Sequence, residues 1–367
     1  MNKVKASLFI FLLIIGLVLA GCSNNNNQDG ATDEQTKTQN QTSDSTSEKE
    51  GITDQNVIKY YFTADEGGSI TKINANTNQV DSTIEVDGMA HNVQVSSDGE
   101  MLAATVVPNM DHGDDDSMNM DMPGTALFLN TATNEVVNTV EVGNHPAHIV
   151  FTENGKYVLV TNNEDDTVSV IDTSTFKVVN TISTGNRPHG FRITADSSTA
   201  YIANMGEDTV SVINLKTMKE DKKIKVGSAP VTTGITSDGK TLIATLNAEN
   251  ALAIVNLENE QVDKIPVGNG PAQVYLDSNN EFAYVANQGT EKNPSNSITV
   301  VDIIAKKETA TIETGKGSHG VVTSPDNKRV YVTNMFDHTV SVVDTEQNKV
   351  IETIEVGETP NGISVME

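Results

Sequence analysis

The chain contains no tryptophan and a single cysteine, and only 4% of its 367 residues are aromatic. A lone thiol excludes an internal disulfide and any metal site built from cysteines. It also excludes the Cys-x-x-Cys-His attachment motif, so no haem c is expected. We find no P-loop, no Gly-x-Ser-x-Gly elbow and no dinucleotide-binding glycine fingerprint, so neither a nucleotide nor a nicotinamide cofactor is expected.

Basic residues are also scarce. Lys and Arg together number 24 against 50 Asp and Glu, which gives a formal net charge of −26. Such an excess of negative charge repels nucleic acid and anionic lipid headgroups. The absence of an indole also removes a strong stacking surface for bases. We therefore expect no nucleic-acid partner, whereas cationic or metallic partners are weakly favoured.

The first 56 residues differ from the rest. Residues 1–22 hold Lys3 and Lys5, then a short apolar run that ends in Leu19-Ala20-Gly21-Cys22. This pattern predicts a bacterial lipoprotein signal peptide with lipidation, palmitate included, at Cys22; an uncleaved anchor helix is the alternative. Residues 23–56 are almost entirely polar and predict a disordered tether. The remainder should then lie on the outer face of a cell membrane, more in keeping with a single-membrane cell.

Residues 57–367 contain an internal repeat. A strand-like segment that ends in Gly or its equivalent occurs seven times, at spacings of 56, 42, 42, 41, 47 and 42 residues. The central residues of these segments are Ile84, Val140, Ile182, Ile224, Ile265, Ile312 and Ile354. A period of about 42 residues is typical of propeller blades.

Each unit reads as four short strands, named A to D from the channel outward. In the last unit they are residues 319–324, 329–334, 339–344 and 350–356. Every strand C ends in a residue whose side chain can accept a hydrogen bond in a tight turn: Asn74, Asn130, Asp172, Asn214, Asn256, Asp302 and Asp344.

The ends of the repeat array predict how the ring closes. Residues 57–63 read as a strand B with no strand A before it, and residues 361–367 read as a strand A with nothing after it. The C-terminal strand should therefore complete the first blade and leave no free inner edge. We predict an all-β, seven-bladed propeller of four-stranded blades, and expect a monomer.

The repeated pattern "YVTN…TVSVID…KVV.TI.VG..P.G" resembles the YVTN family of β-propellers over the whole of this domain. More distantly it is similar to the propellers of quinohaemoprotein amine dehydrogenase, of lactonases, and of the nitrous oxide and cytochrome d1 reductases. The resemblance implies the fold and not one function, because propellers support both enzymes and binding scaffolds. Since the chain lacks the tryptophan usual in quinone-cofactor propellers, no pyrroloquinoline quinone (PQQ) is expected.

Strand direction places the D–A and B–C loops at one mouth of the central channel. The aligned position four residues after each strand-D glycine is occupied by His91, Ala147, His189, Val231, Ala272, His319 and Asn361. Three imidazoles at the narrowest radius predict a copper, zinc or iron site. The alternative is that duplication of the repeat copied histidine as a turn residue, without a metal. His148 lies one residue further along its strand and is expected to point elsewhere.

The second unit carries an insertion, residues 108–124, in its B–C loop. It combines thioethers, one imidazole and carboxylates: Met110, His112, Met118, Met120 and Met122, with Asp111, Asp114, Asp115, Asp116 and Asp121. Met selects Cu(I), and His binds either oxidation state, so this segment predicts copper. A disordered acidic tip that binds Ca²⁺ loosely is the weaker alternative, because the required calcium-loop order is absent.

Three further ligand-type residues fall in other B–C loops, namely Met205, Met335 and His338. They either complete a site with the insertion or are ordinary loop residues.

Three function classes stay open at this point. The first is a membrane-anchored extracytoplasmic binding protein that holds copper. The second is a metal-dependent redox enzyme or lactonase-like hydrolase at the channel mouth. The third is a scaffold for another extracytoplasmic protein or the cell wall. Whether the chain is an enzyme is left undecided, since catalysis requires an open coordination position and storage does not.

Overall fold

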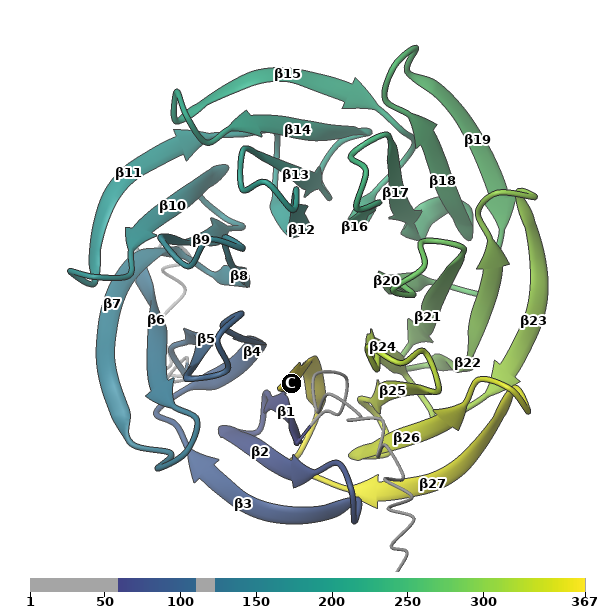
Figure 1. Cartoon of the computed structure of the whole chain (residues 1–367), viewed down its shortest axis with the longest axis horizontal. Coiled ribbons are helices and arrows are strands. Elements are labelled where there is room, and N and C mark those ends of the chain that lie inside the picture. The colour runs from purple at the N-terminus through teal and green to yellow at the C-terminus, as the bar shows by residue number, and fades with distance from the viewer. Residues whose placement is uncertain (1–58, 110–122, 367) are drawn as a thin grey trace, which may run out of the picture. The chain divides into compact units, whose positions relative to one another are not determined.

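The computed structural model describes residues 59–109 and 123–366. They form a ring of seven sheets, each of four antiparallel strands (Figure 1). Within these ranges the one helical element is a three-residue 3-10 turn, Asn247–Glu249, and no helix there is long and apolar enough to cross a membrane. The signal peptide, Cys22, the tether and residues 110–122 lie outside the described residues.

The strands of each blade follow one another from the channel outward. Blade one is β28 (Pro360–Met366), β1 (Tyr60–Asp65), β2 (Ser69–Asn74) and β3 (Gln79–Glu85); blade two is β4 (Met89–Val95), β5 (Met101–Val107), β6 (Pro123–Asn130) and β7 (Val136–Asn144). Blade three is β8 (Pro146–Phe151), β9 (Tyr157–Asn162), β10 (Thr167–Asp172) and β11 (Lys177–Ser183); blade four is β12 (Pro188–Ile193), β13 (Thr199–Asn204), β14 (Thr209–Asn214) and β15 (Lys219–Lys225). Blade five is β16 (Pro230–Ile235), β17 (Thr241–Leu246), β18 (Ala251–Asn256) and β19 (Gln261–Pro266); blade six is β20 (Pro271–Leu276), β21 (Phe282–Thr290), β22 (Asn293–Asp302) and β23 (Lys307–Glu313). Blade seven is β24 (Ser318–Thr323), β25 (Arg329–Asn334), β26 (Thr339–Asp344) and β27 (Lys349–Glu355).

The predicted closure is confirmed. The C-terminal β28 pairs antiparallel with β1, from Tyr60 opposite Met366 to Asp65 opposite Pro360. The Lys59 N–H donates to the Met366 carbonyl at 2.8 Å, so the first and last described residues meet on one face of the disc. The blade count of seven is also confirmed.

The apolar core lies between neighbouring blades. Phe191 and Ile202 of blade four, for example, are fully buried in one cluster with Leu159 of blade three. Strands B and C are almost entirely buried, whereas strand D is mostly exposed and buries one residue near its end. Each buried aliphatic or aromatic side chain contributes about 1.5–3 kcal/mol, so adjacent blades stabilise one another and the ring is the cooperative unit.

Two kinds of side-chain hydrogen bond recur in the blades and stabilise their turns and loops. At the end of strand C, the Asn74 Oδ1 accepts the N–H groups of Asn76 and Thr77 at 2.9 and 3.1 Å, and all seven blades repeat the first of these bonds. The Asn that ends strand B in several blades binds the preceding D–A loop. In blade three, the Asn162 Oδ1 accepts the Gly143 N–H at 3.0 Å, which holds the D–A loop against the blade.

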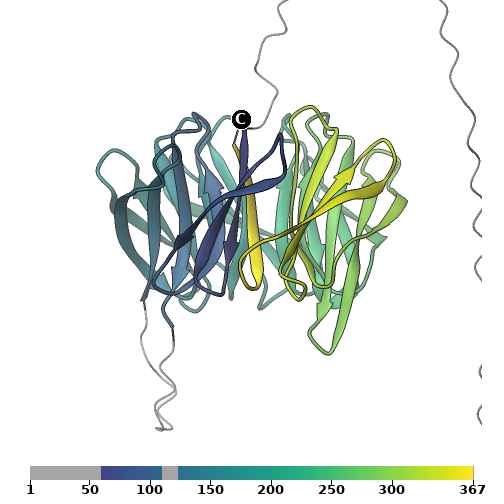
Figure 2. The same ribbon diagram turned by 90° about the horizontal axis from the view of Figure 1, so that it is seen from below.

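The ends of the channel are built from different loops. At one end, which we name the D–A mouth, B–C loops bond to D–A loops: the Asn163 N–H donates to the His145 carbonyl at 3.1 Å, and the Met335 N–H to the Gly317 carbonyl at 2.9 Å. The A–B turns bound the opposite end, which we name the A–B mouth. Figure 2 shows the disc edge-on with strands running between these two faces.

Candidate metal centre at the D–A mouth

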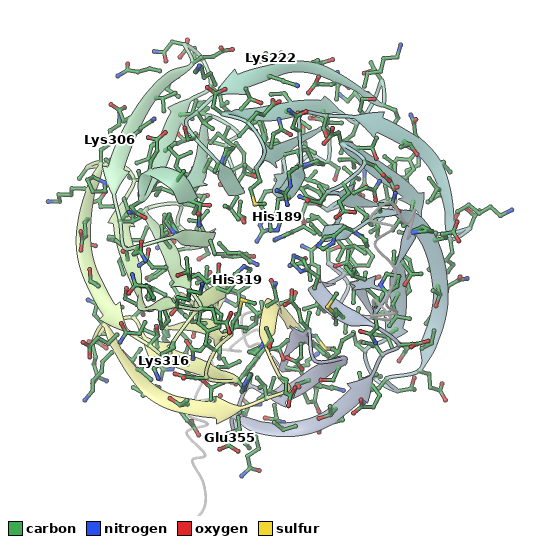
Figure 3. All side chains as sticks on the ribbon, turned by 180° about the vertical axis from the view of Figure 1, so that it is seen from behind. His189, Lys222, Lys306, Lys316, His319 and Glu355 are labelled. Atoms are coloured by element: carbon green, nitrogen blue, oxygen red, sulfur yellow. The ribbon has the colours of Figure 1, made fainter. Side chains whose placement is uncertain are left out.

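Imidazoles from blades two, three and four lie in ring contact at the D–A mouth, whereas His319 of blade seven makes no such contact among the described residues. The ring centres of His91 and His189 are 5.5 Å apart, those of His148 and His189 4.9 Å, and those of His91 and His148 6.4 Å. We name the histidine cluster by its five members: His91, His145, His148, His189 and His319. Figure 3 shows His189 and His319 at the edge of the central opening.

His148 joins the cluster because strand β8 begins with a bulge. Pro146 lies opposite Asn162 and Ile149 opposite Val160, so Ala147 and His148 together face a single residue of β9, Thr161. A bulge interrupts the alternation of side chains and re-aims them. The expectation that a one-residue offset turns His148 away from its neighbours is therefore wrong.

A buried threonine fixes this bulge. The Thr161 hydroxyl accepts the His148 N–H at 2.9 Å and donates to the His189 carbonyl at 2.9 Å, which links blades three and four. Thr333 does the same between the Gly320 N–H and the Asn361 carbonyl, at 2.7 and 3.0 Å. Two histidine-bearing inner strands are thus held by hydroxyl bridges from strand B.

Glu66 is a site residue that the sequence prediction missed. Its Oε1 accepts from the His91 Nδ1 at 2.8 Å and from the Asn361 Nδ2 at 2.8 Å. Burial alone raises the pKa of Glu66, but the hydrogen bond and the charge of His91 outweigh it, and the net pKa is lowered. Glu66 follows strand B directly, as Met205 and Met335 do in their blades. Aligning that position across the seven units would have found it.

Contacts with carbonyl and carboxylate oxygens favour one tautomer of three imidazoles, although the Gln273 Nε2 also lies 3.4 Å from the His319 Nδ1. The Nδ1 atoms of His189 and His319 lie 3.3 Å from the carbonyl oxygens of Val231 and Asn361, so each Nδ1 carries the proton when it makes this bond. The same follows for His91 against the Glu66 carboxylate. The lone pair then resides on Nε2, which is the form that binds metals. The Nε2 atoms of His91 and His148 are buried and have no hydrogen-bond partner among the described residues.

Burial favours the neutral form of four of the five histidines, namely His145, His148, His189 and His319. It lowers the pKa of His148 and His189 well below the usual value, and the neighbouring histidines add to the effect. The pKa of His319 falls to about 4 for the same two reasons. His145 is shifted in the same direction, by burial and by His91. Neutral imidazoles need not release a proton before they bind a cation.

The spacing of the imidazole rings suits a metal ion, but their nitrogen atoms are not yet arranged to bind one. Imidazoles on a single tetrahedral ion, at about 2.0 Å from metal to nitrogen, have ring centres about 5 Å apart. The separations of 4.9 and 5.5 Å match this figure. The ring nitrogens do not converge, however, and in the described part of the chain no three His, Cys, Asp or Glu side chains are placed to hold a metal ion. Rings would have to turn on binding.

Two of the additional ligand candidates have structural contacts. His338 is exposed, and its Nδ1 accepts the Thr359 N–H at 2.9 Å. At the equivalent place in blade three, the Asp166 Oδ1 accepts the Arg187 N–H at 2.7 Å. His338 and Asp166 also share a positive φ, 55° and 56° respectively. His338 is therefore a turn residue like Asp166. The buried Met335 accepts a hydrogen bond from the Gln288 Nε2 at its sulfur, at 3.1 Å.

Met205 is half-buried in the B–C loop of blade four, and its N–H donates to the Arg187 carbonyl at 2.9 Å. Its position corresponds to that of Glu66 in blade one. The described contacts therefore place it in the ring of B–C loops that surrounds the D–A mouth.

The insertion starts and ends at the same mouth as the histidine cluster. Its proposed ligands Met110, His112, Met118, Met120 and Met122 lie outside the described residues. Its flanks are described: Val107 pairs with Met89 at the start of β4, and a Cβ on Gly124 would lie 2.3 Å from the Pro146 ring. Both flanks thus touch inner strands that carry His91 and His148.

Comparison with known proteins supports the fold. The model of the YNCE-like β-propeller family matches residues 147–294. A search of curated proteins finds no match. Hydrazine synthase from Kuenenia stuttgartiensis aligns with a TM-score of 0.65 at 19% identity, over 76% of this chain and 89% of that one. A putative 6-phosphogluconolactonase from Bacteroides fragilis aligns with a TM-score of 0.66 at 15% identity, over 85% of this chain and 99% of that one. Identities this low indicate a shared fold only.

Proposed function

We propose that this seven-bladed β-propeller, with its YNCE-like segment, is a lipid-anchored extracytoplasmic protein that binds copper at the D–A mouth. The observation that carries the proposal is the meeting of His91, His148 and His189. The Nε2 atoms of His91 and His148 are buried and have no hydrogen-bond partner in the described part of the chain. Imidazole accepts both oxidation states of copper. The Glu66–His91 pair is the carboxylate–histidine arrangement that orients metal-binding imidazoles in proteins.

The insertion gives this site a second set of ligands in the proposal. Its thioethers favour Cu(I) over harder cations, and its described flanks adjoin the strands of His91 and His148. We infer that residues 108–124 capture the ion and that the histidine cluster retains it.

The proposed anchor is the acylated Cys22. Labelling cells with radioactive palmitate tests the anchor: the wild-type chain should incorporate the label and a Cys22→Ser variant should not. Equal labelling of the two would refute lipidation at Cys22.

Copper binding is tested by native mass spectrometry and competition titration on the purified full chain. Three variants are compared: a deletion of residues 109–122, the triple variant H91A/H189A/H319A, and H338A as the control histidine. We expect the deletion to remove most Cu(I) binding. The triple variant should no longer retain the bound ion, whereas H338A should bind copper as the wild type does. Unchanged stoichiometry after the deletion removes the insertion from the site. If no transition metal binds to the wild type, the proposal fails and the scaffold interpretation replaces it.

The Glu66–His91 contact favours a second candidate, a metal-dependent hydrolase. A carboxylate 2.8 Å from an imidazole can hold a proton while a bound water attacks a substrate. Lactone hydrolysis by the copper- or zinc-loaded chain, lost in Glu66→Gln with metal content unchanged, would favour the enzyme over the binding protein.

A further inference from the structure

The A–B mouth holds a single arginine inside the channel. Arg192 lies on β12 of blade four, and its guanidinium carbon is 5.1 Å from the ring centre of Tyr275 on β20 of blade six. The aligned position of the intervening blade is Gly234, which has no side chain. Arg192 therefore spans one blade to reach the aromatic ring.

The guanidinium of Arg192 is incompletely paired. One of its N–H groups donates to the Phe191 carbonyl at 2.9 Å, from the Nη1 atom. Among residues 59–109 and 123–366 it forms no salt bridge, whereas Arg329 on the same face of the disc pairs with Asp344 at 2.7 Å. Burial lowers the pKa of Arg192, with Tyr275 and Glu153 acting in the opposite direction. A guanidinium titrates so far above neutral pH that it stays charged in this position.

Two adjoining cavities open beside this side chain, of about 280 and 320 Å³. Both are bounded by Glu153, Arg192, Tyr275 and Val365. The first is otherwise mainly polar, with Asn92, Gln94, Gln273 and the carboxylate of Asp98 in its wall. The second has an apolar wall formed by Ile193, Ile235 and Leu276, and Asp277 also lines it. A fixed positive charge thus lies between a polar and an apolar compartment, which is the usual design of a small-molecule site.

We propose that the A–B mouth binds a small organic carboxylate with a flat apolar body. The carboxylate receives charge-assisted hydrogen bonds from the guanidinium of Arg192, whose fork geometry suits two oxygen atoms. The apolar body packs on Tyr275 and the aliphatic wall beside it. This site does not depend on the copper proposal, because it lies at the opposite mouth and shares none of its ligands.

Isothermal titration of the purified full chain with benzoate tests the proposal, with benzamide as an uncharged probe of the same shape. We expect benzoate to bind at least about tenfold more tightly than benzamide. Arg192→Met should weaken benzoate binding about tenfold or more, and Arg192→Lys by less, since lysine keeps the charge and loses the fork. Arg329→Met, a control on the same face, should bind as the wild type does.

Several outcomes would overturn the site. One is equal affinity for benzoate and benzamide; another is an absence of benzoate binding to the wild type. A third is an Arg192→Met variant that unfolds at a lower temperature but binds benzoate normally, which would reduce the arginine to a structural link between blades. Copper titration of Arg192→Met and benzoate titration of H91A/H189A/H319A separate the two proposals, because each variant should lose one ligand and keep the other.

Discussion

The two mouths of the channel are made by the same seven inner strands, yet they differ in chemistry. The D–A mouth gathers imidazoles, one of which is hydrogen-bonded to the carboxylate of Glu66, whereas the A–B mouth presents the guanidinium of Arg192 beside the ring of Tyr275. The turn residues that close strands C and D are alike in every blade. The repeat therefore preserves the residues that build the blade and varies those that face the channel, so each mouth can acquire its own ligand.

The largest expected effect is the pH dependence of stability at the D–A mouth. The pKa of His319 is about 4 in the folded chain against about 6.5 in an unfolded one. As pH falls from 6.5 to 4, the unfolded chain gains a proton and the folded chain does not, so the free energy of unfolding decreases by about 3 kcal/mol. His148 and His189 act in the same direction.

Urea unfolding of the metal-free chain at pH 7.5 and pH 4 measures this loss. His319→Asn is the matched variant, because Asn361 occupies the aligned position in blade one. The stability of this variant relative to the wild type should improve by about 3 kcal/mol between the two pH values. If His319→Asn follows the wild type at both pH values, the imidazole is not held neutral by burial.

A second effect comes from Asp65, the one carboxylate at a position where four other blades place Asn162, Asn204, Asn287 and Asn334. Burial raises the pKa of Asp65 to about 6, although hydroxyls of Thr71, Thr63 and Ser69 oppose the shift. The folded chain therefore binds a proton more tightly than the unfolded chain does. Stability decreases as pH rises from about 4 to 6, by about 2 to 3 kcal/mol, and this cost persists at neutral pH.

Asp65→Asn should remove that cost. We expect the variant to be more stable than the wild type above pH 6 by about 2 kcal/mol, and equal to it near pH 3.5. The same urea titrations measure the difference. Because the Asp65 and histidine effects oppose each other in the wild type, only the comparison of single variants separates them. A variant less stable than the wild type at neutral pH would show that the carboxylate is ionised and well satisfied by its hydroxyl partners.

The sequence predicted the fold because each blade is encoded locally. Alternating strands and turn residues recur at a fixed period, and the unpaired strands at the two ends of the array are enough to predict closure. The site was predicted less completely. His91, His189 and His319 followed from alignment, but the direction of His148 depends on a bulge that breaks the two-residue alternation and that the residue pattern does not reveal. Glu66 was missed because its partner, His91, lies in the next blade. Copper stays a prediction.

The bulge itself can be tested through Thr161. Thr161→Val keeps the shape of the side chain but leaves the buried His148 N–H and His189 carbonyl without their hydroxyl partner. We expect a loss of about 2 kcal/mol in unfolding free energy and weaker copper binding, because both rings lose their anchor. Thr333→Val is the comparison on blade seven, where the bridge joins Gly320 and Asn361. Benzoate binding at the A–B mouth should be unaffected by Thr161→Val.

The smallest expected effect concerns the charge of Glu66. Glu66→Gln can still accept the proton of the His91 Nδ1, so the ring keeps its tautomer, but the imidazole becomes a weaker donor to a metal once the carboxylate charge is gone. Copper affinity, measured by competition titration, should fall about tenfold. Glu164→Gln is the matched control, because Glu164 lies 3.8 Å from the ring nitrogen of His145 and is 60% exposed. An equal loss in both variants would attribute the effect to net charge at the D–A mouth. A loss confined to Glu66→Gln would mean that the short contact with His91, and not the general negative field, prepares the imidazole for the ion.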